Sequence, residues 1–174
     1  MKVDRIINAD CLDELKKFKD ETIDLVVTSP PYDNLREYNN SSTWNFDVFK
    51  EVAAGLVRTL KPGGVICWNV GDAVVSDMQG KKSGPSLSGT SFKQCLYFME
   101  LGLNFHDKLI YEKHAARFAS GKNSLRYTDI YEYVFVLSKG RPSTINLIRD
   151  RPNKGAGKVF KKDGGRGKDG QRIK

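Results

Sequence analysis

Nine residues, Asp24 to Tyr32, constrain the fold of this chain more than any other stretch, and they read Asp-Leu-Val-Val-Thr-Ser-Pro-Pro-Tyr. The apolar, largely β-branched residues 25–27 favour a buried strand covered on both faces. Pro30 and Pro31 lack the amide hydrogen that a ladder needs, so the strand has to end there. The sequence therefore predicts a stiff loop at the carboxyl end of a central strand, where open α/β sheets bind ligands.

The residues of this loop suit a planar ligand that carries an amino group. Tyr32 is not needed for a turn, and its ring can stack on a nucleobase. The hydroxyl of Ser29 and the rigid carbonyls beside it can accept hydrogen bonds from an exocyclic amine. The alternative is a strand that ends in an ordinary proline turn.

The string Thr28-Ser29-Pro30-Pro31-Tyr32 resembles the signature of the amino-group DNA methyltransferases, which is Asp, Asn or Ser, then Pro-Pro, then Tyr or Phe. The resemblance implies catalytic roles for Ser29, Pro30, Pro31 and Tyr32. It also implies double-stranded DNA as substrate and S-adenosylmethionine as methyl donor, with no metal. Serine at the first position leans toward N4 of cytosine over N6 of adenine.

Hydrophobic periodicity alternates between strand and helix along residues 5–140. The predicted elements are strand 5–8, a helix after Asp10, helix 46–60, strand 65–70, a helix over 92–99, and strands 104–111 and 131–137. We expect the last two strands to form a terminal antiparallel hairpin. Helix, Leu-Lys-Pro-Gly-Gly and strand is a sequence typical of Rossmann-like methyltransferases. The resemblance thus implies an α/β fold with a Rossmann-like sheet, incomplete here, and helices on both faces.

Asp10 has two compatible interpretations. An aspartate just before Leu12, Leu15 and Phe18 can cap the helix that these residues predict. The strand-Asp-helix segment also resembles the part of the family that contacts the adenosyl group of the cofactor. The resemblance therefore implies cofactor-binding roles for Asp10, Cys11 and Ser29.

Positive charge is concentrated in one segment. The formal net charge is +8, and residues 141–174 hold 11 Lys and Arg against 3 Asp and Glu, which leaves residues 1–140 neutral. We expect residues 1–140 to form the catalytic part and residues 141–174 to be a basic tail, either disordered or the start of a target-recognition region. Solvated surface is the alternative for the basic loop residues that we assign to DNA phosphates, which are Arg36, Lys81, Lys82, Lys113, Arg117 and Lys122.

One expected part is missing. The early Pro-Pro-Tyr segment resembles the permuted (β-type) methyltransferases, whose Phe-x-Gly-x-Gly cofactor loop comes late, and this sequence has no Phe-x-Gly-x-Gly. The chain is then truncated, or a second polypeptide or a second copy completes the cofactor site. Two other functions stay open: a DNA-binding module or split subunit without activity, and a methyltransferase of RNA or of a protein amide nitrogen. Three widely spaced cysteines and the absence of a long apolar run predict a cytoplasmic protein.

Overall fold

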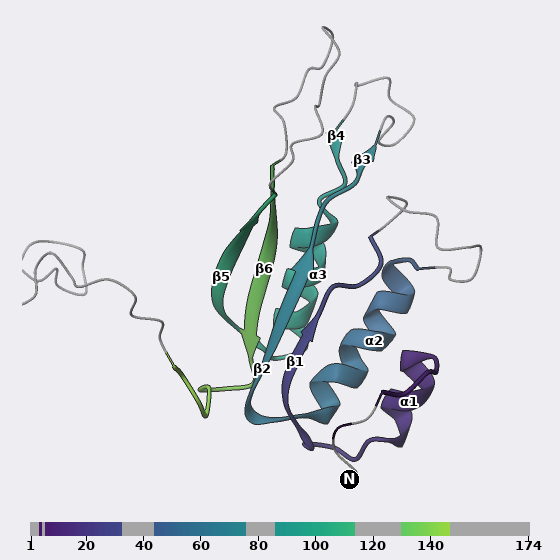
Figure 1. The fold of residues 1–174 in the computed structure, drawn as a ribbon, viewed down its shortest axis with the longest axis vertical. Helices are drawn as coiled ribbons and strands as arrows, with labels where there is room; N and C mark the ends of the chain where they lie inside the picture. The colour runs from purple at the N-terminus through teal and green to yellow at the C-terminus, as the bar shows by residue number, and fades with distance from the viewer. Residues whose placement is uncertain (1–3, 5, 33–43, 76–85, 114–129, 147–174) are drawn as a thin grey trace, which may run out of the picture. The chain divides into compact units, whose positions relative to one another are not determined.

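The structure is a computed structural model, and it describes residues 4, 6–32, 44–75, 86–113 and 130–146 (Figure 1). Residues 1–144 form one compact unit and residues 145–174 a second, of which residues 145 and 146 are described. The elements follow in the order α1 (Cys11–Lys17), β1 (Ile23–Thr28), α2 (Phe46–Thr59), β2 (Leu60–Val70), β3 (Val74–Val75), β4 (Ser86–Leu87), α3 (Thr90–Glu100), β5 (Asn104–Glu112) and β6 (Tyr131–Ser138).

Four strands form a mixed sheet in the order β1-β2-β6-β5. The first two strands run parallel, with Val27 opposite Cys67. Strand β6 is antiparallel to both of its neighbours, and Cys67 lies opposite Val136. The expected α/β fold with a terminal antiparallel hairpin is confirmed by this arrangement. Strands β3 and β4 make a separate small antiparallel pair.

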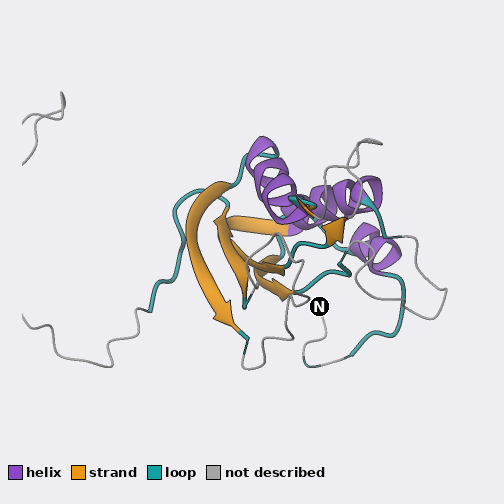
Figure 2. Ribbon diagram, turned by 90° about the horizontal axis from the view of Figure 1, so that it is seen from above, coloured by secondary structure: helices purple, strands orange, loops and turns teal. Residues whose placement is uncertain are grey.

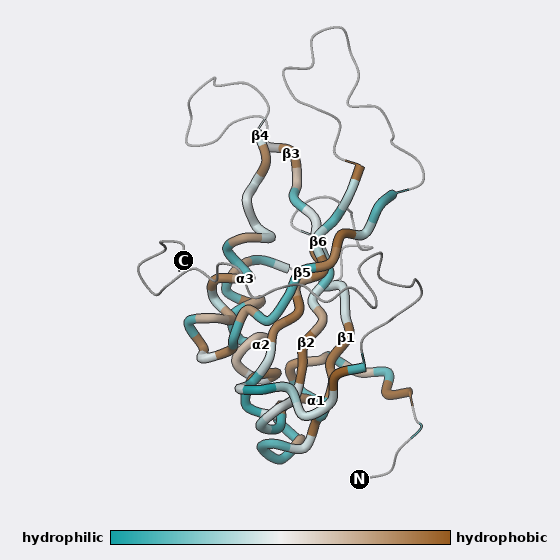
Figure 3. The backbone as a smooth tube through the Cα atoms, turned by 90° about the vertical axis from the view of Figure 1, so that its left-hand side faces the viewer, coloured by the Kyte–Doolittle hydropathy of each residue, from teal (hydrophilic) through white to brown (hydrophobic). Residues whose placement is uncertain are grey.

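The core lies between the sheet and α2 and α3. Phe49 and Ala53 of α2 are fully buried against Trp68 of β2 and Phe98 of α3, and Asn45 caps α2 through its side-chain oxygen. The rings of Phe49, Trp68 and Phe98 meet with centroids 5.1–5.8 Å apart. In Figure 3, the brown colour of hydrophobic residues extends along much of β2. Burial of one apolar stripe of each helix therefore fixes the helices on the sheet.

The described helices cover a single face of the sheet, which corrects the expectation of helices on both faces (Figure 2). Leu12 and Leu15 of α1 pack on the same core as α2 and α3. On the opposite face, Leu25 is 57% exposed and Val27 is 71% exposed. Alternation along the strand sends these two side chains away from the helices. We predicted that strand β1 is covered on both faces, but the described chain covers only the face toward the helices.

Two local predictions were also wrong. Residues 6–8 form no strand, because no described strand lies beside them to supply ladder hydrogen bonds. Strand β2 begins at Leu60, directly after α2, and includes the Lys-Pro-Gly-Gly sequence, which we expected to separate helix 46–60 from strand 65–70. Gly63 has a φ of +79° inside this strand, and a Cβ there would lie 3.1 Å from the Arg141 carbonyl oxygen. A close backbone approach, not a helix end, requires that glycine.

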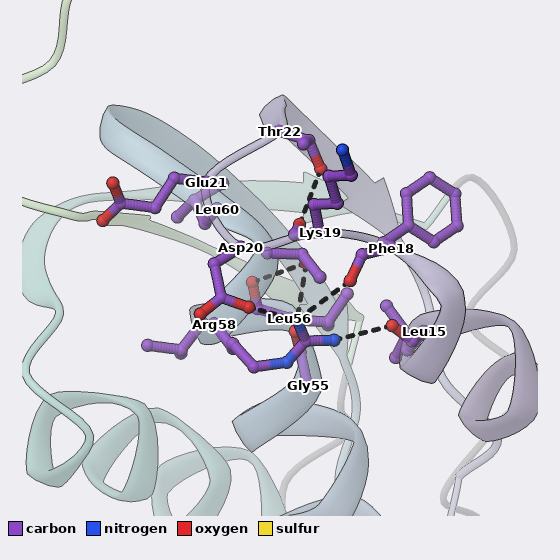
Figure 4. Close-up of polar contacts among 12 residues, drawn as sticks. Leu15, Phe18, Lys19, Asp20, Glu21, Thr22, Gly55, Leu56, Arg58 and Leu60 are labelled. Carbon is purple, nitrogen blue, oxygen red and sulfur yellow. Dashed lines mark hydrogen bonds and ion pairs between the residues drawn. The ribbon is translucent and has the colours of Figure 1, made fainter. Parts of the chain in front are cut away.

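Arg58 ties the end of α2 to the end of α1 (Figure 4). Its guanidinium donates to the carbonyl oxygen of Leu15 over 2.7 Å and to that of Phe18 over 2.9 Å, and it pairs with Asp20. A helix of seven residues is marginal by itself, so this cationic cap on its last carbonyls stabilises α1. None of the helices in the described ranges is long and apolar enough to cross a membrane.

Candidate functional site

The ends of three strands meet at one edge of the sheet and bring the Pro-Pro-Tyr loop together with a residue 100 positions away. Ser29 to Tyr32 follow the carboxyl end of β1, and Gly71 follows the carboxyl end of the parallel strand β2. Because β6 is antiparallel to β2, its amino end lies at the same edge and carries Glu132. The site is thus assembled by strand direction and register.

A chain of hydrogen bonds links the loop to β6. The Tyr32 hydroxyl donates to Oε2 of Glu132 over 2.7 Å. The Ser29 hydroxyl donates to the Tyr32 hydroxyl oxygen over 3.1 Å. Tyr32 is half-buried and its oxygen is fixed, so the orientation of its ring is set by these contacts.

Glu132 is held by further donors around its carboxylate. Lys113, the last described residue after β5, places Nζ 3.0 Å from Oε1, and Nδ2 of Asn69 lies 3.4 Å from Oε2. Burial by itself raises the pKa of Glu132, whose side chain is 14% exposed, but the hydrogen bonds from Tyr32 and Lys113, the charge of Lys113 and the Asn69 contact outweigh it. The pKa of Glu132 therefore lies below its ordinary value, and the carboxylate is ionised at neutral pH.

Gly71, the first residue after β2, lies beside these side chains. A Cβ at this position would lie 3.4 Å from both Oε1 of Glu132 and Cε2 of Tyr32. These are ordinary van der Waals distances, so Gly71 borders both groups without a tight contact. Asn69, two residues earlier on the same strand, also donates to the carbonyl oxygen of Tyr133 over 3.1 Å.

A cavity of about 230 Å³ lies on the helix side of the Pro-Pro-Tyr loop. Its walls come from the loop, α1, α2 and two tryptophans: Cys11, Leu15, Val26, Thr28, Ser29, Pro30, Pro31, Trp44, Val52, Leu56 and Trp68. The indole Nε1 of Trp44 is buried and has no hydrogen-bond partner among the residues that the structure describes. Burial, and after it the charge of Asp10, raises the pKa of the Cys11 thiol, so this side chain enters the wall as a neutral group.

The structure brings some of the residues predicted from the sequence together. Ser29, Pro30 and Pro31 line the cavity with Cys11, while Tyr32 and Lys113 meet at Glu132. Asp10 caps α1 by accepting from the amide of Leu12 over 2.8 Å, which confirms its structural role. The other residues assigned to DNA lie outside the described residues, and these are Arg36, Lys81, Lys82, Arg117 and Lys122. Most of the basic tail, residues 147–174, does too.

Sequence reasoning missed an aspartate that shapes the neighbouring segment. Asp72 accepts from the amide of Ser91 over 3.0 Å, from its hydroxyl over 2.6 Å and from the Ser88 hydroxyl over 3.2 Å. The N-cap of α3 is Gly89, which has no side chain to cap the helix, so Asp72 takes that role from the end of β2. Asn69 was missed as well, although a polar residue inside a buried strand is a usable signal.

Comparisons with known proteins point to DNA methylases. A family model described as DNA methylase (N6_N4_Mtase) matches residues 23–172. The orphan methyltransferase M.BamHII of Bacillus amyloliquefaciens is 49% identical over 156 residues, covering 89% of this chain and 53% of that protein. The chain thus spans about half the length of this curated relative.

Solved structures share the fold. The cytosine-N4-specific PvuII DNA methyltransferase is 26% identical with a TM-score of 0.59, covering 77% of this chain and 48% of the other. The M1.HpyAVI–SAM complex is 14% identical with a TM-score of 0.52, covering 84% of this chain and 60% of the other. The second likeness concerns the fold alone.

Proposed function

This chain belongs to the N6/N4 DNA methylase family, and we propose from that premise that it carries the base-binding part of a methyltransferase that modifies an exocyclic amino group of DNA. The observation that carries the proposal is the placement of Ser29, Pro30 and Pro31 at the carboxyl end of β1, on the wall of a cavity, with the Tyr32 ring fixed beside them.

The chemistry asks for positioned hydrogen-bond acceptors. An exocyclic amine is a poor nucleophile because its lone pair is delocalised into the ring. Hydrogen bonds from the amine to the Ser29 hydroxyl and the Pro30 carbonyl would draw the nitrogen toward a tetrahedral geometry, so that its lone pair points out of the ring plane. Tyr32 would stack on the base, which has to be flipped out of the duplex to reach the loop.

S-adenosylmethionine supplies an electrophilic methyl group when it is bound. The cavity fits part of such a cofactor: its volume of about 230 Å³ is below the roughly 300–1,000 Å³ of pockets for whole drug-sized ligands. It offers the Ser29 hydroxyl and Nε1 of Trp44, a donor without a partner within the described chain. We assign the adenosyl part to this cavity, with Cys11 and Ser29 in contact and Asp10 at the start of α1.

A further polypeptide segment would complete the cofactor site and the sheet. Strand β1 stands at the end of the strand order, so its outer edge has no partner strand within the described chain. Its side chains Leu25 and Val27 are exposed on the face that no described helix covers. Parallel strands are normally buried on both faces, which supports a second polypeptide or a second copy that pairs with β1 and covers this face.

N4 of cytosine is the target that we favour over N6 of adenine. Serine precedes the Pro-Pro-Tyr of this chain, and a cytosine-N4-specific enzyme is among its structural neighbours at a TM-score of 0.59. Lys113 directly follows strand β5 and pairs with Glu132. We therefore assign Lys113 to the proposed base-binding site instead of to DNA phosphates. Arg36, Lys81, Lys82, Arg117 and Lys122 stay assigned to phosphates, with double-stranded DNA as the partner.

Mass spectrometry of nucleosides tests the proposal. Unmodified DNA is incubated with deuterium-labelled S-adenosylmethionine and either the chain alone or the chain plus the unmatched half of the Bacillus amyloliquefaciens relative. We expect labelled N4-methylcytosine with the second mixture, and none when Ser29→Ala replaces the wild type. Labelled N6-methyladenine would correct the base. No label with a folded chain in either mixture would reject the activity and leave a DNA-binding module.

A further inference from the structure

An ionised carboxylate terminates the hydrogen-bond chain that begins at the proposed catalytic serine. Oxygen atoms of Ser29, Tyr32 and Glu132 follow one another at 3.1 Å and 2.7 Å. Ser29 and Tyr32 lie on the loop after β1, while Glu132 follows Tyr32 by 100 residues and lies on β6. These hydrogen bonds therefore connect the proposed catalytic Ser29 to a side chain that is held by strand β6.

The carboxylate decides the direction of every hydrogen bond in this chain. An ionised carboxylate has no hydrogen to give and acts only as an acceptor. The Tyr32 hydroxyl has one hydrogen, and it must be the donor to Glu132. The Ser29 hydroxyl must then donate its own hydrogen to the Tyr32 oxygen. Both lone pairs of the Ser29 oxygen are left for other donors.

This direction is the one that an amine substrate needs. An exocyclic amino group brings two hydrogens and requires acceptors from the protein. A serine hydroxyl that is free to rotate can turn its hydrogen toward the amine and lose the contact. A hydroxyl whose hydrogen is committed elsewhere presents only lone pairs, and the commitment is made before the substrate arrives.

We infer that Glu132 is a positioning residue, whose carboxylate fixes the direction of the Ser29–Tyr32–Glu132 chain and so holds the Ser29 hydroxyl as an acceptor toward the amine. The inference rests on the proposed amino-methyltransferase function of the same site. It assigns to Glu132 an effect on the reacting group that passes entirely through Tyr32.

Two other contacts keep the carboxylate in its place. Lys113 pairs with Oε1, the oxygen that Tyr32 does not use, so both carboxylate oxygens are held. Nδ2 of Asn69 lies 3.4 Å from Oε2 and is a second donor to the carboxylate. Direct hydrogen bonds to the charged form also lower the pKa of Glu132, which keeps it an acceptor at neutral pH.

Kinetics of three variants tests the inference in the protein mixture that transfers methyl groups. Tyr32→Phe retains the ring that stacks on the base but breaks the chain. We expect kcat to fall about 10- to 100-fold, the effect of one hydrogen bond to a charged group, with KM for DNA unchanged. Glu132→Ala should lower kcat equally, and the double variant should lose no more than either single variant.

A conservative variant and a control separate positioning from folding. The amide of Glu132→Gln can accept from Tyr32 but can also donate to it, so kcat should lie between those of the wild type and Glu132→Ala. Glu112→Gln removes the same charge from an exposed position on the neighbouring strand β5, and we expect wild-type kcat. Independent, additive losses in Tyr32→Phe and Glu132→Ala, or an effect on KM alone, would overturn the inference.

Nuclear magnetic resonance tests the chain of hydrogen bonds without any turnover. In protein labelled with ¹³C at the glutamate carboxyl carbon, the Glu132 signal is identified by its absence in Glu132→Gln. Its pKa should lie below the ordinary glutamate value and should rise in Tyr32→Phe, because a stabilising donor is lost. An unchanged pKa in Tyr32→Phe would reject the inference, even if no DNA methylation were found and the proposed function itself had failed.

Discussion

Replacing Gln94 with leucine should destabilise the protein, because it leaves a buried hydrogen-bond donor without its acceptor. The indole Nε1 of Trp68 donates to Oε1 of Gln94 over 2.8 Å, and both residues are 1% exposed. Leucine is of similar volume but offers no acceptor. A buried donor left unsatisfied costs about 1–3 kcal/mol, so the free energy of unfolding should fall by about that amount in Gln94→Leu.

The same substitution should be harmless once the donor is gone. Trp68→Phe removes the indole N–H and leaves the Gln94 amide without its partner. In that background Gln94→Leu takes away the remaining unpaired polar group, so its cost should fall to about zero or become a gain. The coupling between the two positions should therefore be about 1–3 kcal/mol.

Urea unfolding followed by circular dichroism measures all four proteins of this cycle. A shift of the midpoint at constant slope reports stability alone. Lys93→Leu places a leucine at an exposed position of the same helix and should change stability by no more than about 0.5 kcal/mol. An equal cost of Gln94→Leu in both backgrounds would refute the reasoning. Because Trp68 also lines the cavity beside Pro30, this hydrogen bond fixes one wall of the proposed cofactor site.

Four further predictions follow from particular contacts. Arg58→Met keeps the aliphatic stem but removes the donors to the Leu15 and Phe18 carbonyls, and urea unfolding should show a loss of about 1–3 kcal/mol; an unchanged midpoint would exclude the proposed helix cap. Folding lowers the pKa of Glu132, so its ionised form contributes stability above the unfolded pKa that is lost as pH falls through the folded pKa. Glu132→Gln should therefore flatten the acid side of a urea-stability profile, and identical slopes would contradict the lowered pKa. Val27→Lys should change the stability of the chain alone by no more than about 0.5 kcal/mol, because Val27 is 71% exposed, yet it should abolish methyl transfer by the complemented protein; full activity would show that nothing covers this face. Tyr32→Ala should weaken binding to DNA with an extruded base by about 1–3 kcal/mol in a fluorescence titration, and equal affinity would reject stacking.

Local signals identified most of the elements correctly. The apolar stripe from Phe46 onward predicted α2 to within one residue, because apolar residues that recur with a period of 3.6 indicate a helix with one buried face. Asp10 was recognisable as a cap, and the strands of the terminal hairpin were recognisable from β-branched and aromatic runs. Residues 6–8, the described part of the predicted strand 5–8, form no strand, since apolar character alone does not supply a neighbouring strand.

The site was only partly readable for a related reason. Ser29 and Tyr32 belong to one contiguous string that resembles a family signature, so the amino-acid sequence is enough to single them out as candidates. Glu132 stands in a strand-like run where a charge has several explanations, and its meaning depends on Tyr32 and Lys113 reaching it. Asp72 follows the predicted strand 65–70, and nothing in its local sequence indicates that it caps a helix that begins 18 positions later.

The sequence by itself determined the α/β class, the family and the loop that would meet the base, because these depend on local backbone preference and on a short chemical string. Only the tertiary structure decided that one sheet face is left open in the described chain and that Glu132 accepts a hydrogen bond from Tyr32, which in turn accepts one from Ser29. The physical reason is that both properties arise from strand order and register, which join Tyr32 to a partner 100 residues away.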